Sequence, residues 1–130
     1  MIHLDTSFLI RSLVPGSSED ARLRHWLGAD EPLGMSANAW AEFLCGPVSA
    51  DHVELATQIV TDRLPFSEQD ATLAAELFNL SGRRRGSLGD CMIAAASMRA
   101  TASLVTSNAT DFHRFVAHGL ELIDGSHHPE

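Results

Sequence analysis

The chain has 130 residues, a length that suits one domain with one hydrophobic core. Its net charge is −8 at pH 7, which excludes a protein that coats nucleic acid through a basic surface. It contains no lysine, so a P-loop nucleotide triphosphatase, which needs a lysine in its phosphate-binding loop, is also excluded.

The first half of the chain alternates apolar runs with helical patterns. Pro15-Gly16 is expected to end the first helix, and Glu19 and Asp20 lie in the first turn of the second, where the helix dipole favours acidic side chains. The expected elements are a strand at residues 1–5, a helix over 6–14, a helix that begins at Ser17 or Ser18, a strand at 32–36, and helices over 38–44 and 50–61.

The second half continues the alternation. Ser67 and Asp70 form a variant capping box at the start of a helix. The expected elements are an edge strand at 64–66, a helix over 67–82, a basic turn at 83–86, an alanine-rich buried helix over 90–100, a strand at 103–106, a short helix capped by Asn108, and a strand at 120–123. This order predicts an α/β/α sandwich around a mostly parallel sheet of four to five short strands.

The cellular setting is also an expectation from the sequence. Asp5 interrupts the apolar run that a signal peptide would need, and the longest apolar stretch is too short to span a bilayer. Cys45 and Cys91 lie in apolar stretches and are expected to be buried thiols, with no spacing that suggests zinc. We therefore expect a soluble, cytoplasmic protein.

Four acidic residues stand at positions that matter in such a fold. Asp5 ends the first strand, Asp90 opens the alanine-rich helix, and Asp111 closely follows the strand at 103–106. Each has an ordinary structural alternative: Asp5 as a helix cap, Asp90 as a dipole acid, and Asp111 as the partner of a capping Asn108. Glu42 is different, because a carboxylate among the apolar residues around it is costly to bury unpaired.

Together the four acids indicate a cation site. Ligands of parallel α/β domains bind at the carboxyl ends of the strands. Two carboxylates about 4 Å apart repel by about 4 kcal/mol at an effective dielectric constant near 20, so four ionised groups would need a counter-ion. The chain has no lysine to supply it, and a hard divalent cation prefers oxygen ligands.

The motifs around these acids resemble those of PIN-domain ribonucleases, in particular the VapC-type toxins of bacterial toxin–antitoxin pairs. Residues 1–10 resemble the opening strand and first acid of that family, and residues 41–46 its second motif, an acid on a helix that ends in glycine. Residues 90–96 and 106–112 are similar to the third and fourth motifs. The resemblance covers nearly the whole chain; Trp40 and Cys45 depart from the pattern without touching an acidic position.

The resemblance implies a PIN-like nuclease domain over residues 1–125 and a metal-dependent endoribonuclease. The polar residues at 126–130 are expected to form a C-terminal tail. Asp5, Glu42, Asp90 and Asp111 would be catalytic and would hold Mg²⁺ or Mn²⁺, with Asp5 and Asp90 as the direct ligands. Glu42 and Asp111 could act through water, because Mg²⁺ usually keeps several water molecules.

Further polar residues have two interpretations each. Thr6, Thr106 and Asn108 would orient the ligands by hydrogen bonds, or they could be ordinary cap and turn residues. The run Arg83-Arg84-Arg85 could grip the RNA backbone near the site, or it could be a solvated turn. No histidine nucleophile is needed, and His3 and His113 are expected to be packing or surface residues.

The family resemblance also implies partners: a cognate antitoxin, an RNA substrate and a second copy of the chain in a homodimer, with no membrane involved. A phospho-acceptor receiver domain is excluded because it needs a lysine, and a haloacid-dehalogenase-type phosphatase because Ser7 stands where it needs an aspartate. A PIN-like binding module with a structural metal and little turnover remains an alternative.

Overall fold

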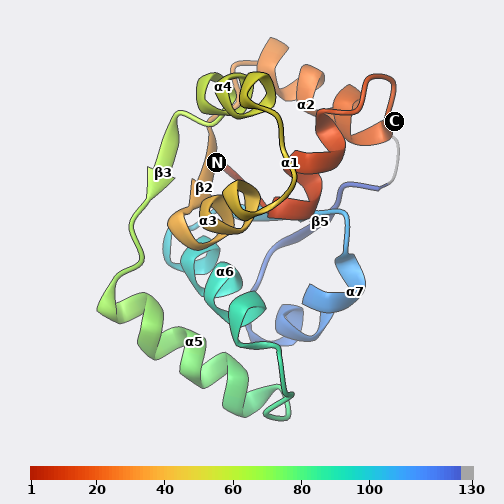
Figure 1. Cartoon of the computed structure of the whole chain (residues 1–130). Coiled ribbons are helices and arrows are strands. Elements are labelled where there is room, and N and C mark those ends of the chain that lie inside the picture. Colours follow the sequence, from red (N-terminus) through yellow and green to blue (C-terminus); the bar gives the residue numbers. More distant parts are fainter. Residues whose placement is uncertain (127–130) are drawn as a thin grey trace.

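The computed structural model describes residues 1–126, and its centre is a parallel sheet in the order β3-β2-β1-β4-β5 (Figure 1). The strands are β1 (Ile2–Leu4), β2 (Leu33–Ser36), β3 (Asp62–Leu64), β4 (Ser103–Thr106) and β5 (Leu122–Asp124). Ile2 of β1 pairs with Leu33 on one side and Ser103 on the other. The carboxyl ends of β1 and β4 therefore lie side by side at the middle of the sheet.

Seven α-helices and one 3₁₀ helix connect the strands within residues 1–126. They are α1 (Thr6–Ser12), α2 (Ser18–Gly28), α3 (Ala37–Cys45), α4 (Ala50–Ile59), α5 (Glu68–Leu80), α6 (Leu88–Arg99), α7 (Ala109–Phe112) and η1 (His113–His118). Figure 1 shows α5 lying alongside α6, which is the most extensive helix–helix contact of the fold. None of the helices in this part of the chain is long and apolar enough to cross a bilayer.

The core forms where the sheet meets its covering helices. The strand β1 is buried along its whole length, as expected for a central strand that is covered on both faces. The fully buried aromatic side chains Phe8 of α1 and Phe43 of α3 belong to this core. Helix α6 is buried on most sides, and its small residues Ala94 and Ala95 are both fully covered. The predicted alanine-rich buried helix is thus confirmed.

Most predicted elements are present, with shifts at two strand ends. The edge strand was expected at 64–66, but β3 ends at Leu64, since Pro65 has no N–H to donate to a neighbouring strand. The last strand begins two residues later than expected, at Leu122. The capping box is confirmed: Ser67 Oγ accepts from the Asp70 N–H at 3.1 Å, and Asp70 Oδ2 accepts from the Ser67 N–H at 2.9 Å.

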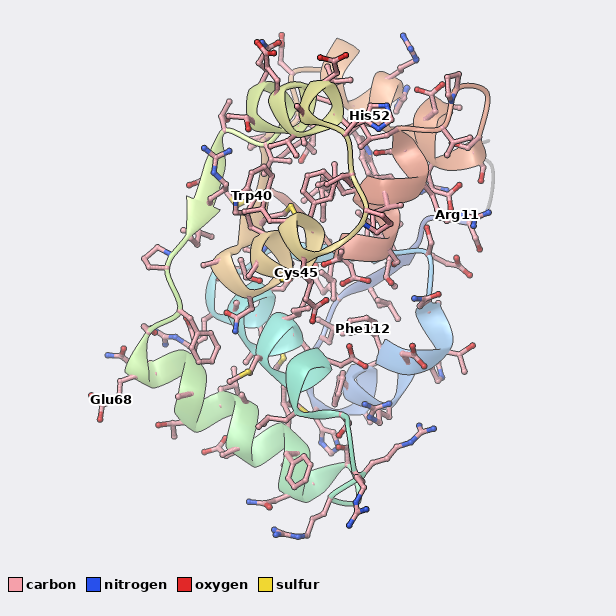
Figure 2. The ribbon with its side chains drawn as sticks, in the orientation of Figure 1. Arg11, Trp40, Cys45, His52, Glu68 and Phe112 are labelled. Atoms are coloured by element: carbon pink, nitrogen blue, oxygen red, sulfur yellow. The ribbon has the colours of Figure 1, made fainter. Side chains whose placement is uncertain are left out.

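The C-terminal tail and the two thiols were also predicted from the sequence. The polar tail was predicted at 126–130; Ser126 bonds to Asp124, and residues 127–130 lie outside the described part of the chain. Cys91 is buried as expected, but the expectation was wrong for Cys45, which is exposed at the end of α3 (Figure 2). Trp40, on the same helix, packs against Arg63 of β3, whose guanidinium carbon lies 4.7 Å from the centroid of the Trp40 ring.

Candidate metal centre

The four predicted acids line one pocket of about 260 Å³, although they come from four different parts of the chain. Asp5 lies at the junction of β1 and α1, Glu42 on α3, Asp90 in the first turn of α6, and Asp111 on α7. The remaining lining residues are Thr6, Ser7, Ile10, Asn108 and Phe112. Figure 2 shows Phe112 on α7 facing the centre of the molecule. The pocket stands at the carboxyl ends of β1 and β4, where parallel α/β proteins bind their ligands.

Asp5 is held by two hydroxyl groups. Its carboxylate is 4% exposed and accepts hydrogen bonds from Ser7 Oγ at 2.7 Å and from Thr106 Oγ1 at 2.8 Å. Asp5 occupies the N-cap position of α1, but its side chain makes no capping hydrogen bond, so the structure contradicts the capping alternative. Both hydroxyl bonds end on Oδ2, and no hydrogen bond among residues 1–126 ends on Oδ1.

The loop after β4 is tied to the same hydroxyl groups. The Asn108 N–H donates to Thr106 Oγ1 at 3.0 Å, and the Ser107 N–H donates to Ser7 Oγ at 3.1 Å. These bonds hold the start of α7, and with it Asp111, next to Asp5. The expectation that Asn108 caps α7 was wrong for its side chain, which makes no capping bond although the residue occupies the cap position. Asn108 acts here through its backbone.

Glu42 stands at the rim of the pocket. Burial of an unpaired Glu42 carboxylate would be costly, and the structure avoids this cost, because Glu42 is exposed while Phe43 on the same helix is fully buried. The Thr6 hydroxyl lies 2.9 Å from the Ala39 carbonyl oxygen and 3.2 Å from Glu42 Oε2. Thr6 therefore contacts Glu42, whereas Thr106 contacts Asp5, so each of these two acids has its own hydroxyl partner.

Burial and neighbouring negative charge shift the pKa values of two of the acids. Burial, followed by the charges of Asp5 and Asp111, raises the pKa of Asp90 to about 6, while Arg114 opposes the shift. Partial burial also raises the pKa of Glu42, against the hydrogen bond from Thr6. A cation bound among these groups would offset the like-charge repulsion that contributes to both shifts.

The donor chemistry of the pocket fits a hard divalent cation, since its four ionisable groups are all carboxylates. The four carboxylates are not yet arranged as a complete set of metal ligands. Among residues 1–126, no three His, Cys, Asp or Glu side chains are grouped so as to hold a metal ion. The hydrogen bonds to Asp5 and Glu42 occupy one oxygen of each carboxylate and leave the other oxygen to bind an ion. The four acidic side chains would have to move closer together to coordinate that ion.

The three arginines of the run Arg83-Arg84-Arg85 do not share one environment. Arg84 and Arg85 line a second pocket that includes Asp90 and Asp111, whereas Arg83 does not line it. The Arg83 guanidinium instead bonds to Asn79 Oδ1 and lies 5.6 Å from the Phe78 ring centroid.

Three further residues near the site were missed by sequence reasoning. Arg114, three positions after Asp111, lines the second pocket. Ser7 joins Asp5 to the loop after β4, and its position two residues after the acid was the available signal. Glu19 was assigned only to the dipole of α2, but it is 2% exposed and accepts a 2.6 Å hydrogen bond from Ser107 Oγ.

Comparison with known proteins places this fold in a known group. A family model described as "PIN domain" matches residues 2–117. A toxin–antitoxin complex from Klebsiella pneumoniae has a chain that is 18% identical, covering 99% of this chain and 100% of its own, with a TM-score of 0.75. VapBC-1 from nontypeable Haemophilus influenzae gives 23% identity, coverage of 98% and 100%, and a TM-score of 0.71.

A third solved structure is VapC20 from Mycobacterium tuberculosis, described as a sarcin-ricin loop cleaving toxin. It is 15% identical, covers 95% of this chain and 98% of its own, and has a TM-score of 0.65. These low identities with nearly full coverage show a shared fold. Among curated proteins, no sequence matches this chain significantly.

Proposed function

This chain belongs to the PIN domain family, and we propose that it is a metal-dependent endoribonuclease, the toxin component of a toxin–antitoxin pair. The observation that carries the proposal is the convergence of Asp5, Glu42, Asp90 and Asp111 on one pocket at the carboxyl ends of the strands. Phosphodiester hydrolysis needs charge stabilisation at the phosphate, and a carboxylate site that holds a divalent metal suits this requirement.

In this proposal Asp5 and Asp90 ligate Mg²⁺ or Mn²⁺ directly, and Glu42 and Asp111 act through water. When bound, the ion would lower the pKa of a coordinated water molecule and offset negative charge on the phosphate. The metal requires ionised ligands, so Asp90, with a pKa of about 6, must lose its proton before the ion binds.

The neighbouring hydroxyl groups have a positioning role. Ser7 and Thr106 hold Asp5 by one oxygen, which fixes the direction of the other. Thr6 restrains Glu42 in the same way. Such hydrogen bonds reduce the freedom that a ligand loses when the metal binds, and their loss should weaken both metal affinity and activity.

The direct test is cleavage of total RNA by the purified protein, freed of any antitoxin, with Mg²⁺, Mn²⁺ or EDTA. Asp90→Asn removes a proposed direct ligand, and Asp30→Asn, at an exposed position outside the pocket, is the matched control. We expect discrete fragments that require metal, persist in Asp30→Asn and vanish in Asp90→Asn. Equal cleavage by all three proteins would instead identify a contaminating nuclease.

A second candidate function is a PIN-like binding module with a structural metal and little turnover. In that module the four acids that line the pocket would hold the ion without supporting hydrolysis, so the site geometry is common to both functions. Both functions predict that Mn²⁺ raises the melting temperature. Only the nuclease predicts fragments, and metal-dependent stabilisation without any cleavage would favour the binding module.

The proposed partners rest on the relatives. Several similar chains come from toxin–antitoxin complexes, which supports an antitoxin partner for this chain. Co-expression with the adjacent reading frame, followed by purification on a tag placed on this chain, should recover a small companion protein that suppresses cleavage. Homodimer formation remains a prediction, and light scattering of the purified chain at several concentrations tests it; a monomer throughout would contradict it.

A further inference from the structure

A second pocket of about 230 Å³ adjoins the acidic one, since Asp90 and Asp111 line both. Its other lining residues are Arg84, Arg85, Gly86, Ser87 and Arg114. The second pocket is thus lined by three arginines together with two of the four carboxylates of the acidic pocket. In a chain with a net charge of −8, such a gathering of arginines requires a physical explanation.

The arginines of this pocket differ from arginines elsewhere in the molecule. Arg11, Arg24 and Arg99 each form an ion pair with an acidic side chain, at 3.1, 2.8 and 3.3 Å. Across residues 1–126, by contrast, no ion pair and no side-chain hydrogen bond involves the guanidinium groups at the second pocket. A guanidinium carries five N–H donors, so these groups retain their capacity to bind an anion.

Arg114 is held in place by packing. Its guanidinium carbon lies 4.5 Å from the ring centroid of Phe115, which is fully buried. Its Nε is buried and has no hydrogen-bond partner in the described structure. Stacking on a fixed aromatic ring restricts the guanidinium, so less conformational entropy is lost when it binds a ligand. Arg114 also lines the same pocket as Asp90 and Asp111, which places it beside the acidic pocket.

The start of α6 adds to the positive character of the pocket. Ser87 occupies the N-cap position of this 12-residue helix but makes no capping bond, because its hydroxyl donates to the Arg84 carbonyl oxygen at 2.7 Å. The side chain that would normally accept from the first-turn N–H groups is therefore turned away. Uncapped N–H groups and the positive end of the helix dipole attract anions.

We propose that Arg84, Arg85 and Arg114 form a phosphate subsite, which holds a backbone phosphate of the RNA beside the phosphodiester bond at the carboxylates. This assignment rests on the proposed nuclease function, which places the reacting phosphodiester bond of the RNA at the carboxylates. Arg83 is not part of the subsite, because it bonds to Asn79 and does not line the pocket. In this proposal the adjacent arginines Arg83 and Arg84 thus have different roles.

The experiment compares Arg114→Gln and Arg85→Gln with the matched control Arg83→Gln. The probe is a fluorescent single-stranded RNA oligonucleotide, whose binding to the full chain is measured by anisotropy over a series of KCl concentrations. Cleavage is prevented by EDTA in one series and by Ca²⁺ in another. Arg85 is exposed in a turn, so Arg85→Gln tests the subsite even where Arg114→Gln disturbs the packing on Phe115.

We expect Arg114→Gln and Arg85→Gln each to weaken binding by about tenfold and to lower the slope of log K against log salt by about one. Arg83→Gln should change affinity by less than about twofold, with an unchanged slope. Equal losses in all three variants would overturn the subsite, as would unchanged slopes in Arg85→Gln and Arg114→Gln. Absence of RNA binding by the unmodified chain in both series would also overturn it.

These outcomes are separable from those of the proposed nuclease. RNA binding with the expected pattern but without metal-dependent cleavage would retain the phosphate subsite and reject the nuclease. Metal-dependent cleavage with an unchanged KM in Arg85→Gln and Arg114→Gln would retain the nuclease and reject the subsite. Where both hold, the loss in the two variants should appear mainly in KM, because a phosphate beside the reacting bond is bound before and during the reaction.

Discussion

The hydroxyl of Thr106 donates a 2.8 Å hydrogen bond to Oδ2 of Asp5, although the two residues lie 101 positions apart in the chain. The sheet brings them together, because Leu4 of β1 pairs with Val105 of β4. Asp5 directly follows Leu4 in the chain, and Thr106 directly follows Val105. The strand order therefore creates the candidate metal centre.

Thr106→Val should destabilise the protein. The valine keeps the shape of the side chain but removes the donor to Asp5 and the acceptor of the Asn108 N–H, in a position that is fully buried. Polar groups left without partners in such a site cost about 1–3 kcal/mol, and the free energy of unfolding in urea measures the loss. Thr110→Val, at an exposed position on α7, is the control. Equal stability of the two variants would show that the Thr106 bond contributes nothing.

Asp90→Asn should stabilise the metal-free protein at pH 7.5. The folded pKa of Asp90, about 6, lies above the ordinary aspartate value of 3.8, so folding favours its protonated form. The ionised form costs about 1–2 kcal/mol once partial exposure of the carboxylate is allowed for. Urea unfolding in EDTA at pH 7.5 should show the variant to be more stable by this amount.

The pH dependence of this effect has a defined sign. A raised carboxyl pKa contributes stability below the unfolded value, and that contribution is lost as the pH rises through about 6. The advantage of Asp90→Asn should therefore disappear towards pH 4. Addition of Mn²⁺ at pH 7.5 should reverse the order, since it stabilises the wild type more than the variant. A variant less stable than wild type at pH 7.5 in EDTA would contradict the prediction.

Glu19→Gln should weaken the support behind the centre. Glu19 is buried and accepts from Ser107 Oγ at 2.6 Å, Ser18 Oγ at 3.0 Å and Arg11 Nε at 3.1 Å. Replacing the carboxylate by an amide removes charge-assisted bonds, each of which contributes about 1.5–3 kcal/mol. We expect a loss of about 2 kcal/mol in the free energy of unfolding at pH 7.

Acid should reduce the difference between Glu19→Gln and the wild type. Burial acts to raise the pKa of Glu19, but the hydrogen bonds, with Ser107 first, hold it below its ordinary value. The stability that it supplies is present above the unfolded pKa and is lost as the pH falls through the lower folded value. Arg11→Gln is the control: this arginine is 65% exposed, so its loss should cost less than about 1 kcal/mol. Equal costs for both variants would assign the effect to the ion pair alone.

Gly125→Ala should destabilise the end of β5. A Cβ added at Gly125 would lie 2.7 Å from Phe8 Cε2 and 3.0 Å from Val105 Cγ2, and both side chains are fully buried. Overpacking of this kind costs about 1–3 kcal/mol. Gly28→Ala at the end of α2 meets nothing within 4 Å and should be neutral or slightly stabilising, and thermal unfolding compares the two variants. Similar melting temperatures would contradict the crowding at Phe8.

The sequence by itself determined the order of the elements and the positions of the four acids. Hydrophobic periodicity, Pro15-Gly16 and the capping box at Ser67 depend on residues close together in the chain, and so they could be read without the fold. The four motifs were equally local, and the family that they indicated is confirmed by the PIN domain match. The edge strand at Asp62–Leu64 and the last strand at Leu122–Asp124 depart from that reasoning, because pairing with β2 and β4 sets their positions.

The tertiary structure alone decided which neighbours these residues have. Ser107 donates a hydrogen bond to Glu19, which lies 88 positions away in the chain, and Glu42 is exposed at the rim of the pocket. Arg114 lines the same pocket as Arg84 and Arg85, whereas Arg83 forms a hydrogen bond with Asn79. These contacts depend on the strand order and on how each helix is rotated against the sheet. A local pattern specifies which face of an element is apolar, whereas packing between distant elements decides what each polar group meets.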